Sequence, residues 1–185
     1  MSKRILILKA SPREHGNSAV LAEQAALGAR AAGAEVESVY LHGLDIRPCD
    51  GCDFCLETGA CVIKDDMQSL YPKLSNLDGL ILASPIYWFT YTAQLKLCLD
   101  RCYALWNGNN DFLRGKPVGI ILTYGDKDLY TSGGINAIHT FETTFRFLQA
   151  TIAGWVYGSL SAVGDAEKNP ALMQAAYRLG NHLVS

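Results

Sequence analysis

Four cysteines lie within thirteen residues of this 185-residue chain, in the stretch CDGCDFCLETGAC. They are Cys49, Cys52, Cys55 and Cys61, spaced C-x2-C-x2-C-x5-C. Thiolates two residues apart in a tight loop can bind separate irons of one cubane cluster, and the fourth can come from slightly further along. Zinc bound by four cysteines usually has two C-x2-C pairs separated by a longer stretch. The pattern therefore favours a [4Fe–4S] cluster, with redox-active thiols, packing and oligomer contacts as alternatives.

Two further cysteines, Cys98 and Cys102, lie four residues apart in a predicted helix and so share one face of it. Free cysteine behaves as a small buried hydrophobe, and we expect both in the core.

The composition narrows the class of protein. The net charge is −2, with 49% hydrophobic and 18% charged residues, and no lysine or arginine run indicates nucleic-acid binding. No apolar stretch reaches the roughly 18 residues of a membrane span. The short apolar run near the start does not resemble a signal peptide. We therefore expect a cytoplasmic protein, whose thiols stay reduced rather than forming structural disulfides.

Apolar bursts alternate with helical patterns along the chain. The bursts predict five strands, at 4–10, 35–41, 79–84, 116–125 and 154–160. The helical patterns predict helices at 18–33, 65–77, 92–106, 134–152 and 169–184. This alternation predicts a single α/β domain over 1–185, a five-stranded parallel sheet with helices on both faces, and an inserted cysteine-rich loop at about 47–64.

In such sheets, ligands bind at the carboxyl ends of the strands. The first loop at that edge, ASPREHGNS (10–18), has the features of a phosphate site. A helix start directs free amides toward an anion. Ser11 and Ser18 offer hydroxyls, Arg13 offers a charged donor, and Asn17 or Ser18 can cap the helix. No triphosphatase loop or dinucleotide fingerprint is present.

The second loop, after the strand at 79–84, is unusually apolar and aromatic. A flat partner such as an isoalloxazine ring would cover these side chains, and a neighbouring loop or subunit is the alternative. They are Pro85, Ile86, Tyr87, Trp88 and Phe89.

The stretches SPREHGNS, SPIYWFTYTAQLKLCLDR and TYGD together resemble the NADPH-dependent FMN reductase family, which has a flavodoxin-like fold. The resemblance extends over nearly the whole chain. It implies that the FMN phosphate binds at the first loop, that the aromatic loop wraps the ring, and that a third loop approaches the ring. The implied residues are Ser11, Arg13, Asn17 and Ser18 for the phosphate, Pro85, Ile86, Tyr87, Trp88 and Phe89 for one side of the ring, and Thr123, Tyr124, Gly125 and Asp126 for the third loop.

Within that family the cysteine spacing is most similar to the iron–sulfur flavoprotein branch. The resemblance implies electron transfer between a [4Fe–4S] cluster and FMN, with ferredoxin as a candidate donor. The alternatives are an NAD(P)H-dependent FMN or quinone reductase without a cluster, and a non-enzymatic redox or metal sensor. The family resemblance also implies a homodimer or homotetramer, in which the segment 124–145 could complete a neighbour's flavin site.

Overall fold

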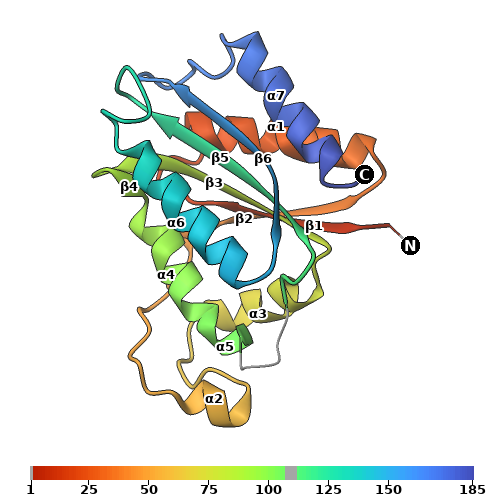
Figure 1. Ribbon diagram of the computed structural model, residues 1–185, viewed down its shortest axis with the longest axis vertical. Helices are drawn as coiled ribbons and strands as arrows, with labels where there is room; N and C mark the ends of the chain where they lie inside the picture. The colour runs from red at the N-terminus through yellow and green to blue at the C-terminus, as the bar shows by residue number, and fades with distance from the viewer. Residues whose placement is uncertain (1, 107–111) are drawn as a thin grey trace.

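A parallel sheet forms the centre of the computed structural model, which describes residues 2–106 and 112–185 (Figure 1). Its strands are β1 (Arg4–Lys9), β2 (Glu35–Tyr40), β3 (Gly79–Tyr87), β5 (Pro117–Tyr124) and β6 (Thr151–Ser159). Their order is β2-β1-β3-β5-β6, and every neighbouring pair on this path is parallel. This is the flavodoxin-like order, whose ligand site lies where the winding reverses, between β1 and β3.

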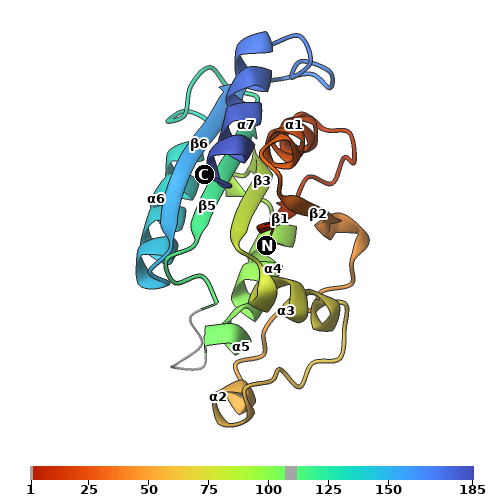
Figure 2. The same cartoon turned by 90° about the vertical axis from the view of Figure 1, so that its right-hand side faces the viewer.

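Helices cover both faces of the sheet, as Figure 2 shows with α6 on one side and α1 on the other. One face carries α1 (Asn17–Ala31) and α7 (Pro170–His182), and the other carries α3 (Met67–Asn76), α4 (Ala93–Arg101) and α6 (Gly134–Phe147). The described residues also include the short helices η1 (Leu41–Gly43), α2 (Phe54–Thr58) and α5 (Tyr103–Trp106). Among the described residues, no helix has the length and apolarity that crossing a membrane requires.

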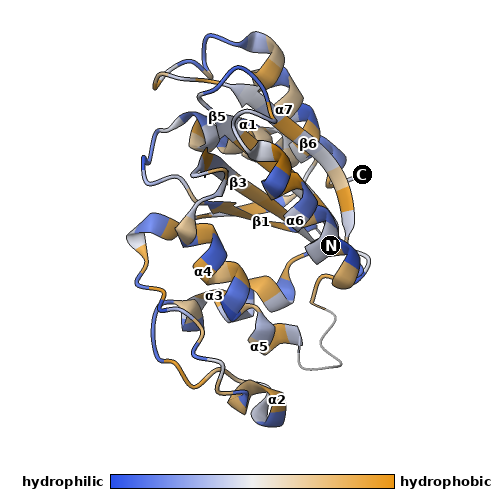
Figure 3. Cartoon of the chain, turned by 60° about the vertical axis from the view of Figure 1, so that its left-hand side comes forward, coloured by the Kyte–Doolittle hydropathy of each residue, from blue (hydrophilic) through white to orange (hydrophobic). Residues whose placement is uncertain are grey.

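The central strands are buried on both sides. In β1, Ile5 and Ile7 pack with the α1 and α7 side, whereas Leu6 and Leu8 pack with α3, α4 and α6. This two-sided burial explains the nearly continuous apolar run in the sequence. Figure 3 shows β1 and β3 as mainly hydrophobic strands, whereas α4 and α6 have both hydrophobic and hydrophilic residues. The more polar β2 lies at the edge of the sheet, as its alternating pattern predicts.

Helices α1 and α7 approach each other through glycines. A Cβ atom added to Gly28 would lie 1.9 Å from the carbonyl oxygen of Tyr177, and one added to Gly180 would lie 1.8 Å from that of Ala25. Neither position can hold a larger residue without moving the helices apart.

The predicted fold class, the five strands and the helices on both faces are confirmed, with three local differences. A sixth strand, β4 (Thr90–Tyr91), pairs antiparallel with the end of β3. The helix predicted over 134–152 ends at Phe147, because Gln149 has a φ of 56° and β6 begins soon after it. The helix predicted over 92–106 divides into α4 and α5. Cys98 and Cys102 are buried, as expected.

Candidate functional site

The first loop joins β1 to α1 at the carboxyl edge of the sheet. Gly16 occupies the N-cap position with φ −71° and ψ 161°, and no side chain caps the helix. The prediction that Asn17 or Ser18 caps α1 is therefore wrong. The first amides of a helix have no partner within it, so those of α1 are free to bind an anion in this loop. Ser11 and Ser18 are buried, and Arg13 is exposed.

The Asn17 side chain braces this loop against the segment after β6. Its Nδ2 donates to the carbonyl oxygens of Leu160 and Ala162, at 3.4 and 2.8 Å. Its Oδ1 accepts from the backbone amide of Ala166 at 3.1 Å. The side chain is thus occupied by neighbouring backbone, and what Asn17 can offer a ligand is its own backbone amide.

The second loop is a two-residue β-hairpin between β3 and β4. Its turn residues, Trp88 and Phe89, have φ values of 47° and 67°. Positive φ at both positions defines a type I′ turn, which normally contains Asn-Gly. For residues other than Gly, Asn and Asp, the left-handed conformation costs about 1–2 kcal/mol of conformational free energy. Strain of this kind concentrates at functional sites. Trp88 is 91% exposed, so packing within the chain does not account for its presence.

The segment before α6 holds the hairpin from the side. A Cβ atom on Gly133, whose φ is 74°, would lie 2.5 Å from the Cα atom of Phe89, so the two backbones touch. The Nδ2 of Asn136 also donates to the carbonyl oxygen of Phe89 at 3.1 Å. The strained turn is therefore fixed in position by a neighbouring element.

The hairpin and the third loop enclose a cleft of about 270 Å³. It is lined by Ile86, Trp88, Phe89, Tyr124, Gly125, Asp126, Thr131 and Ser132. The first six of these were predicted from the sequence. Pro85 and Thr123 are paired in register on adjacent strands just before the cleft, and Tyr87 is partly exposed. Thr131 and Ser132 were missed, although they belong to the glycine-rich segment that the sequence associates with a neighbour's flavin site.

Two features suit this cleft to a polar, flat ligand. A Cβ atom at Gly125 would meet no atom within 4 Å, so the backbone there is open to close approach. Burial, with smaller contributions from Tyr157 and Asp128, raises the pKa of Tyr124 above its usual value. Tyr124 therefore stays protonated at neutral pH and can donate a hydrogen bond.

The first loop and the hairpin are joined beneath the surface by Thr92. Its Oγ1 donates to the carbonyl oxygen of Ala10 at 2.8 Å, and its amide donates to the Oγ of Ser84 at 3.1 Å. These bonds tie the end of β1 and the end of β3 to the start of α4. The structure thus fixes the proposed phosphate loop relative to the aromatic hairpin.

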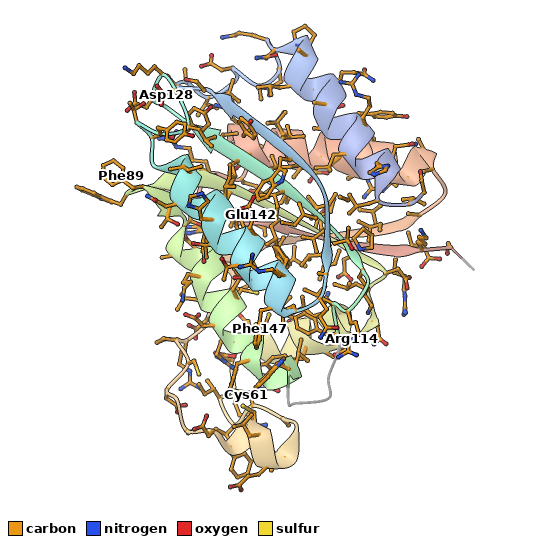
Figure 4. All side chains as sticks on the ribbon, viewed as in Figure 1. Cys61, Phe89, Arg114, Asp128, Glu142 and Phe147 are labelled. Atoms are coloured by element: carbon orange, nitrogen blue, oxygen red, sulfur yellow. The ribbon has the colours of Figure 1, made fainter. Side chains whose placement is uncertain are left out.

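The cysteine loop lies at the far end of α4, where Figure 4 shows Cys61 well away from Phe89. All four cysteines line one pocket of about 130 Å³, with Tyr103 and Val62 on its apolar side. Gly51 and Gly59 have φ values of 67° and 73°, which turn the chain around this space. No disulfide joins the cysteines that the structure describes.

The thiols are close enough to interact electrostatically. Burial raises the pKa of Cys55, and the neighbouring thiols of Cys61, Cys49 and Cys52 raise it further. Across 2–106 and 112–185, no three His, Cys, Asp or Glu side chains form a group suited to one metal ion. The four cysteines share a pocket lining rather than forming a compact three-ligand group.

Comparison with known proteins agrees with this architecture. Residues 3–163 match the family described as NADPH-dependent FMN reductase. An iron–sulfur flavoprotein of Methanosarcina thermophila is 34% identical over 172 residues, covering 91% of this chain and 84% of that protein. One from Methanocaldococcus jannaschii is 33% identical over 138 residues, covering 75% and 70% respectively.

A solved structure, the Trp repressor binding protein from Bacillus subtilis, superimposes with a TM-score of 0.71 at 28% identity, covering 96% of this chain and 99% of that one. Not every relative is matched over its length: the chain spans about half, 51%, of one Archaeoglobus fulgidus iron–sulfur flavoprotein that is 40% identical to it over 114 residues.

Proposed function

The chain belongs to the NADPH-dependent FMN reductase family and is an FMN-dependent oxidoreductase, and we propose that it also carries a [4Fe–4S] cluster that exchanges electrons with the flavin. The cluster ligands would be Cys49, Cys52, Cys55 and Cys61. The observation that carries the proposal is that all four line one pocket. The relatives named iron–sulfur flavoproteins support it.

The residues at the carboxyl edge of the sheet fit FMN. The free amides of α1 and the exposed guanidinium of Arg13 would hold the phosphate, with Ser11 and Ser18 forming the buried part of that loop. The ring would lie in the cleft between the hairpin and the third loop. There Trp88 and Phe89 would cover one side of it and exclude water.

When bound, FMN would supply two-electron chemistry and a cubane cluster one-electron chemistry. The protein supplies position and electrostatics. Tyr124 would donate a hydrogen bond to the polar edge of the ring, and the open backbone at Gly125 would allow that edge to approach. Protons for the reduced flavin would come from solvent at the exposed cleft.

The cluster is tested by purifying the protein without air and measuring iron, acid-labile sulfide and the visible spectrum. We expect about four irons and four sulfides per chain, and their loss in Cys55→Ser. The matched control is Cys98→Ala, which removes a buried thiol outside the loop and should leave the iron content unchanged. Less than one iron per wild-type chain, with the loop thiols titrating free, would refute the cluster.

The second candidate is an NAD(P)H-dependent FMN or quinone reductase without a cluster. It is supported by the family and by the exposed cleft, where a nicotinamide could stack on the flavin. The two candidates differ in their electron donor. Reduction of bound FMN by reduced ferredoxin, abolished in Cys55→Ser, supports the cluster route. Rapid turnover of a quinone with NADPH that is unaffected by this substitution supports the second candidate.

Two further parts of the proposal concern assembly and compartment. We propose one domain over 1–185 that assembles as a homodimer or homotetramer, because Trp88 and Tyr130 are large apolar side chains exposed by 91% and 77% beside the cleft. Light scattering of the FMN-loaded protein tests this, and a monomer at micromolar concentration would contradict it.

We propose a cytoplasmic location, where the loop thiols remain reduced.

A further inference from the structure

Arg101, the last residue of α4, is a fully buried charge. The residue is 1% exposed, and its side chain and that of its partner Asp65 are 0% and 1% exposed. Burying a charge costs on the order of several kcal/mol unless the charge is paired and hydrogen-bonded. The sequence gives Arg101 no role in the flavin site, so its burial requires another explanation.

The guanidinium of Arg101 ties together the two ends of the cysteine loop. Its Nη1 and Nη2 bond the two carboxylate oxygens of Asp65, at 2.5 and 3.1 Å, in a bidentate pair. Nη1 also donates to the carbonyl oxygen of Arg47 at 2.9 Å, and Nη2 to that of Ile63 at 3.4 Å. Arg47 precedes the first cysteine and Ile63 follows the last one. We define the neck of the loop as residues 47 and 63–65, the two chain segments where the loop begins and ends. One side chain therefore holds both segments of the neck together.

Two more side chains reinforce the neck. The carboxylate of Asp65 accepts from the backbone amide of Arg47 at 2.9 Å. The Nε2 of Gln68 donates to the carbonyl oxygens of Cys61 and Ile63, at 3.1 and 2.6 Å. The backbone of the fourth cysteine is thus fixed from α3, while Arg101 fixes the neck from α4.

The same cation acts electrostatically on the cysteine site. Burial opposes the charge of Arg101, but the hydrogen bonds to Asp65, together with Tyr71 and Cys61, raise its pKa overall. The hydroxyl of Tyr71 donates to the carbonyl oxygen of Arg101 at 3.2 Å. The guanidinium bonds the carbonyl oxygen of Ile63, two residues after Cys61, so the buried positive charge lies near the fourth cysteine. Within the described residues, the Nε of Arg101 is buried without a hydrogen-bond partner.

We propose that Arg101 is a positioning residue for the iron–sulfur centre: it closes the neck so that the four thiols line one pocket before iron binds, and its charge stabilises the reduced, more negative cluster. The inference rests on the proposed function. Lysine cannot replace it fully, because a single ammonium cannot bond a carboxylate in a bidentate manner and reach two carbonyl oxygens on opposite sides of the neck.

The closed neck is tested in iron-free protein by trypsin, which cuts after lysine and arginine except before proline, so that Arg47, followed by Pro48, is spared. Lys64 lies in the neck, and its carbonyl oxygen accepts from the Nη2 of Arg47 at 3.1 Å. We expect Arg101→Met and Arg101→Lys to be cut after Lys64 at least tenfold faster than wild type. The control is Lys96→Met, which removes an exposed ion pair with Asp100 on the same helix and should cut at the wild-type rate.

Arg101→Met leaves the Asp65 carboxylate buried without its partner, which destabilises the fold. The double variant Asp65→Asn/Arg101→Met removes both charges, a change that proteins tolerate better than loss of one. Far-UV circular dichroism and FMN binding report whether the rest of the fold is intact. Faster cutting after Lys64 with unchanged FMN affinity supports the inference, and wild-type cutting rates in the folded double variant overturn it.

The charge is tested in reconstituted protein by redox titration followed by electron paramagnetic resonance. We expect Arg101→Met to hold less than half the wild-type iron. Its remaining cluster should be at least tenfold harder to reduce, which is about 59 mV for one electron. Arg101→Lys keeps the charge and should restore most of the potential. Normal iron content and potential in Arg101→Met would overturn this inference alone, whereas a wild-type chain that binds no iron would overturn the proposed function.

Discussion

The hairpin turn offers a substitution that should stabilise the protein while weakening its function. Trp88 has a φ of 47° and is 91% exposed, so Trp88→Asn relieves left-handed strain and loses little packing within its own chain. Asparagine is among the few residues that adopt this conformation readily. We expect FMN-free protein to gain about 1 kcal/mol. For a chain of this size, that gain raises Tm by about 2–4 °C.

The same substitution removes an aromatic face from the proposed ring site. Aromatic pairs contribute about 0.5–1.5 kcal/mol beyond the area they bury. The Kd for FMN should therefore rise about two- to tenfold. Trp88→Phe is the matched control, because it keeps both the strained turn and an aromatic ring, and it should leave Tm and Kd close to wild type.

Thermal unfolding should be followed by far-UV circular dichroism, because Trp88 is one of only three tryptophans and its removal alters the fluorescence. FMN binding can be measured by calorimetry. A lower Tm in FMN-free Trp88→Asn would show that the turn is not strained. An unchanged Kd would show that Trp88 does not contact the ring.

Three further changes test other parts of the structure. Gly28→Ala should cost about 3 kcal/mol or more in urea unfolding, since its Cβ would overlap a carbonyl of α7, whereas Gly43→Ala, with no atom nearer than 3.4 Å, should be nearly neutral. Burial alone would raise the pKa of Asp65, but hydrogen bonds from Arg101 and the Arg47 amide lower it overall. Asp65→Asn should therefore be less stable than wild type at pH 6, with a gap that narrows below about pH 4; a pH-independent gap contradicts this. Asn17→Ala loses three hydrogen bonds, so its Kd for FMN should rise about tenfold, and an unchanged Kd would show that bracing of the loop is unimportant.

The sequence predicts the sheet well because burial on two faces leaves a strong local signal. Each central strand is a short apolar run, and the alternation with helices determines parallel pairing. The errors fall where the signal is weak. The two-residue strand β4 has no periodicity, and the end of α6 depends on one residue, Gln149, that adopts a positive φ without being glycine.

In the candidate site, too, the residues with a strong local signal were predicted and those that depend on distant partners were not. The cysteines were found because their spacing within one loop is informative by itself, and the structure brings all four to one pocket. Arg101 could not be given a role, because its partner Asp65 lies 36 residues earlier and charged residues are usually exposed. Asn17 was assigned to the phosphate, yet its side chain binds backbone at 160–166, a contact across 143 residues or more.

Helix α4 explains why one stretch of sequence holds so many of these residues. Its first turn begins at Thr92, which is bonded to the ends of β1 and β3 beside the flavin cleft. Its last residue is Arg101, which closes the neck of the cysteine loop. Nine helical residues span about 14 Å, at 1.5 Å per residue. A helix of fixed length therefore separates the two proposed sites within a chain. Any residue inserted into it would rotate Arg101 by about 100° and open the neck. The proposed flavin site and the proposed cluster site are thus held at a fixed separation by this helix.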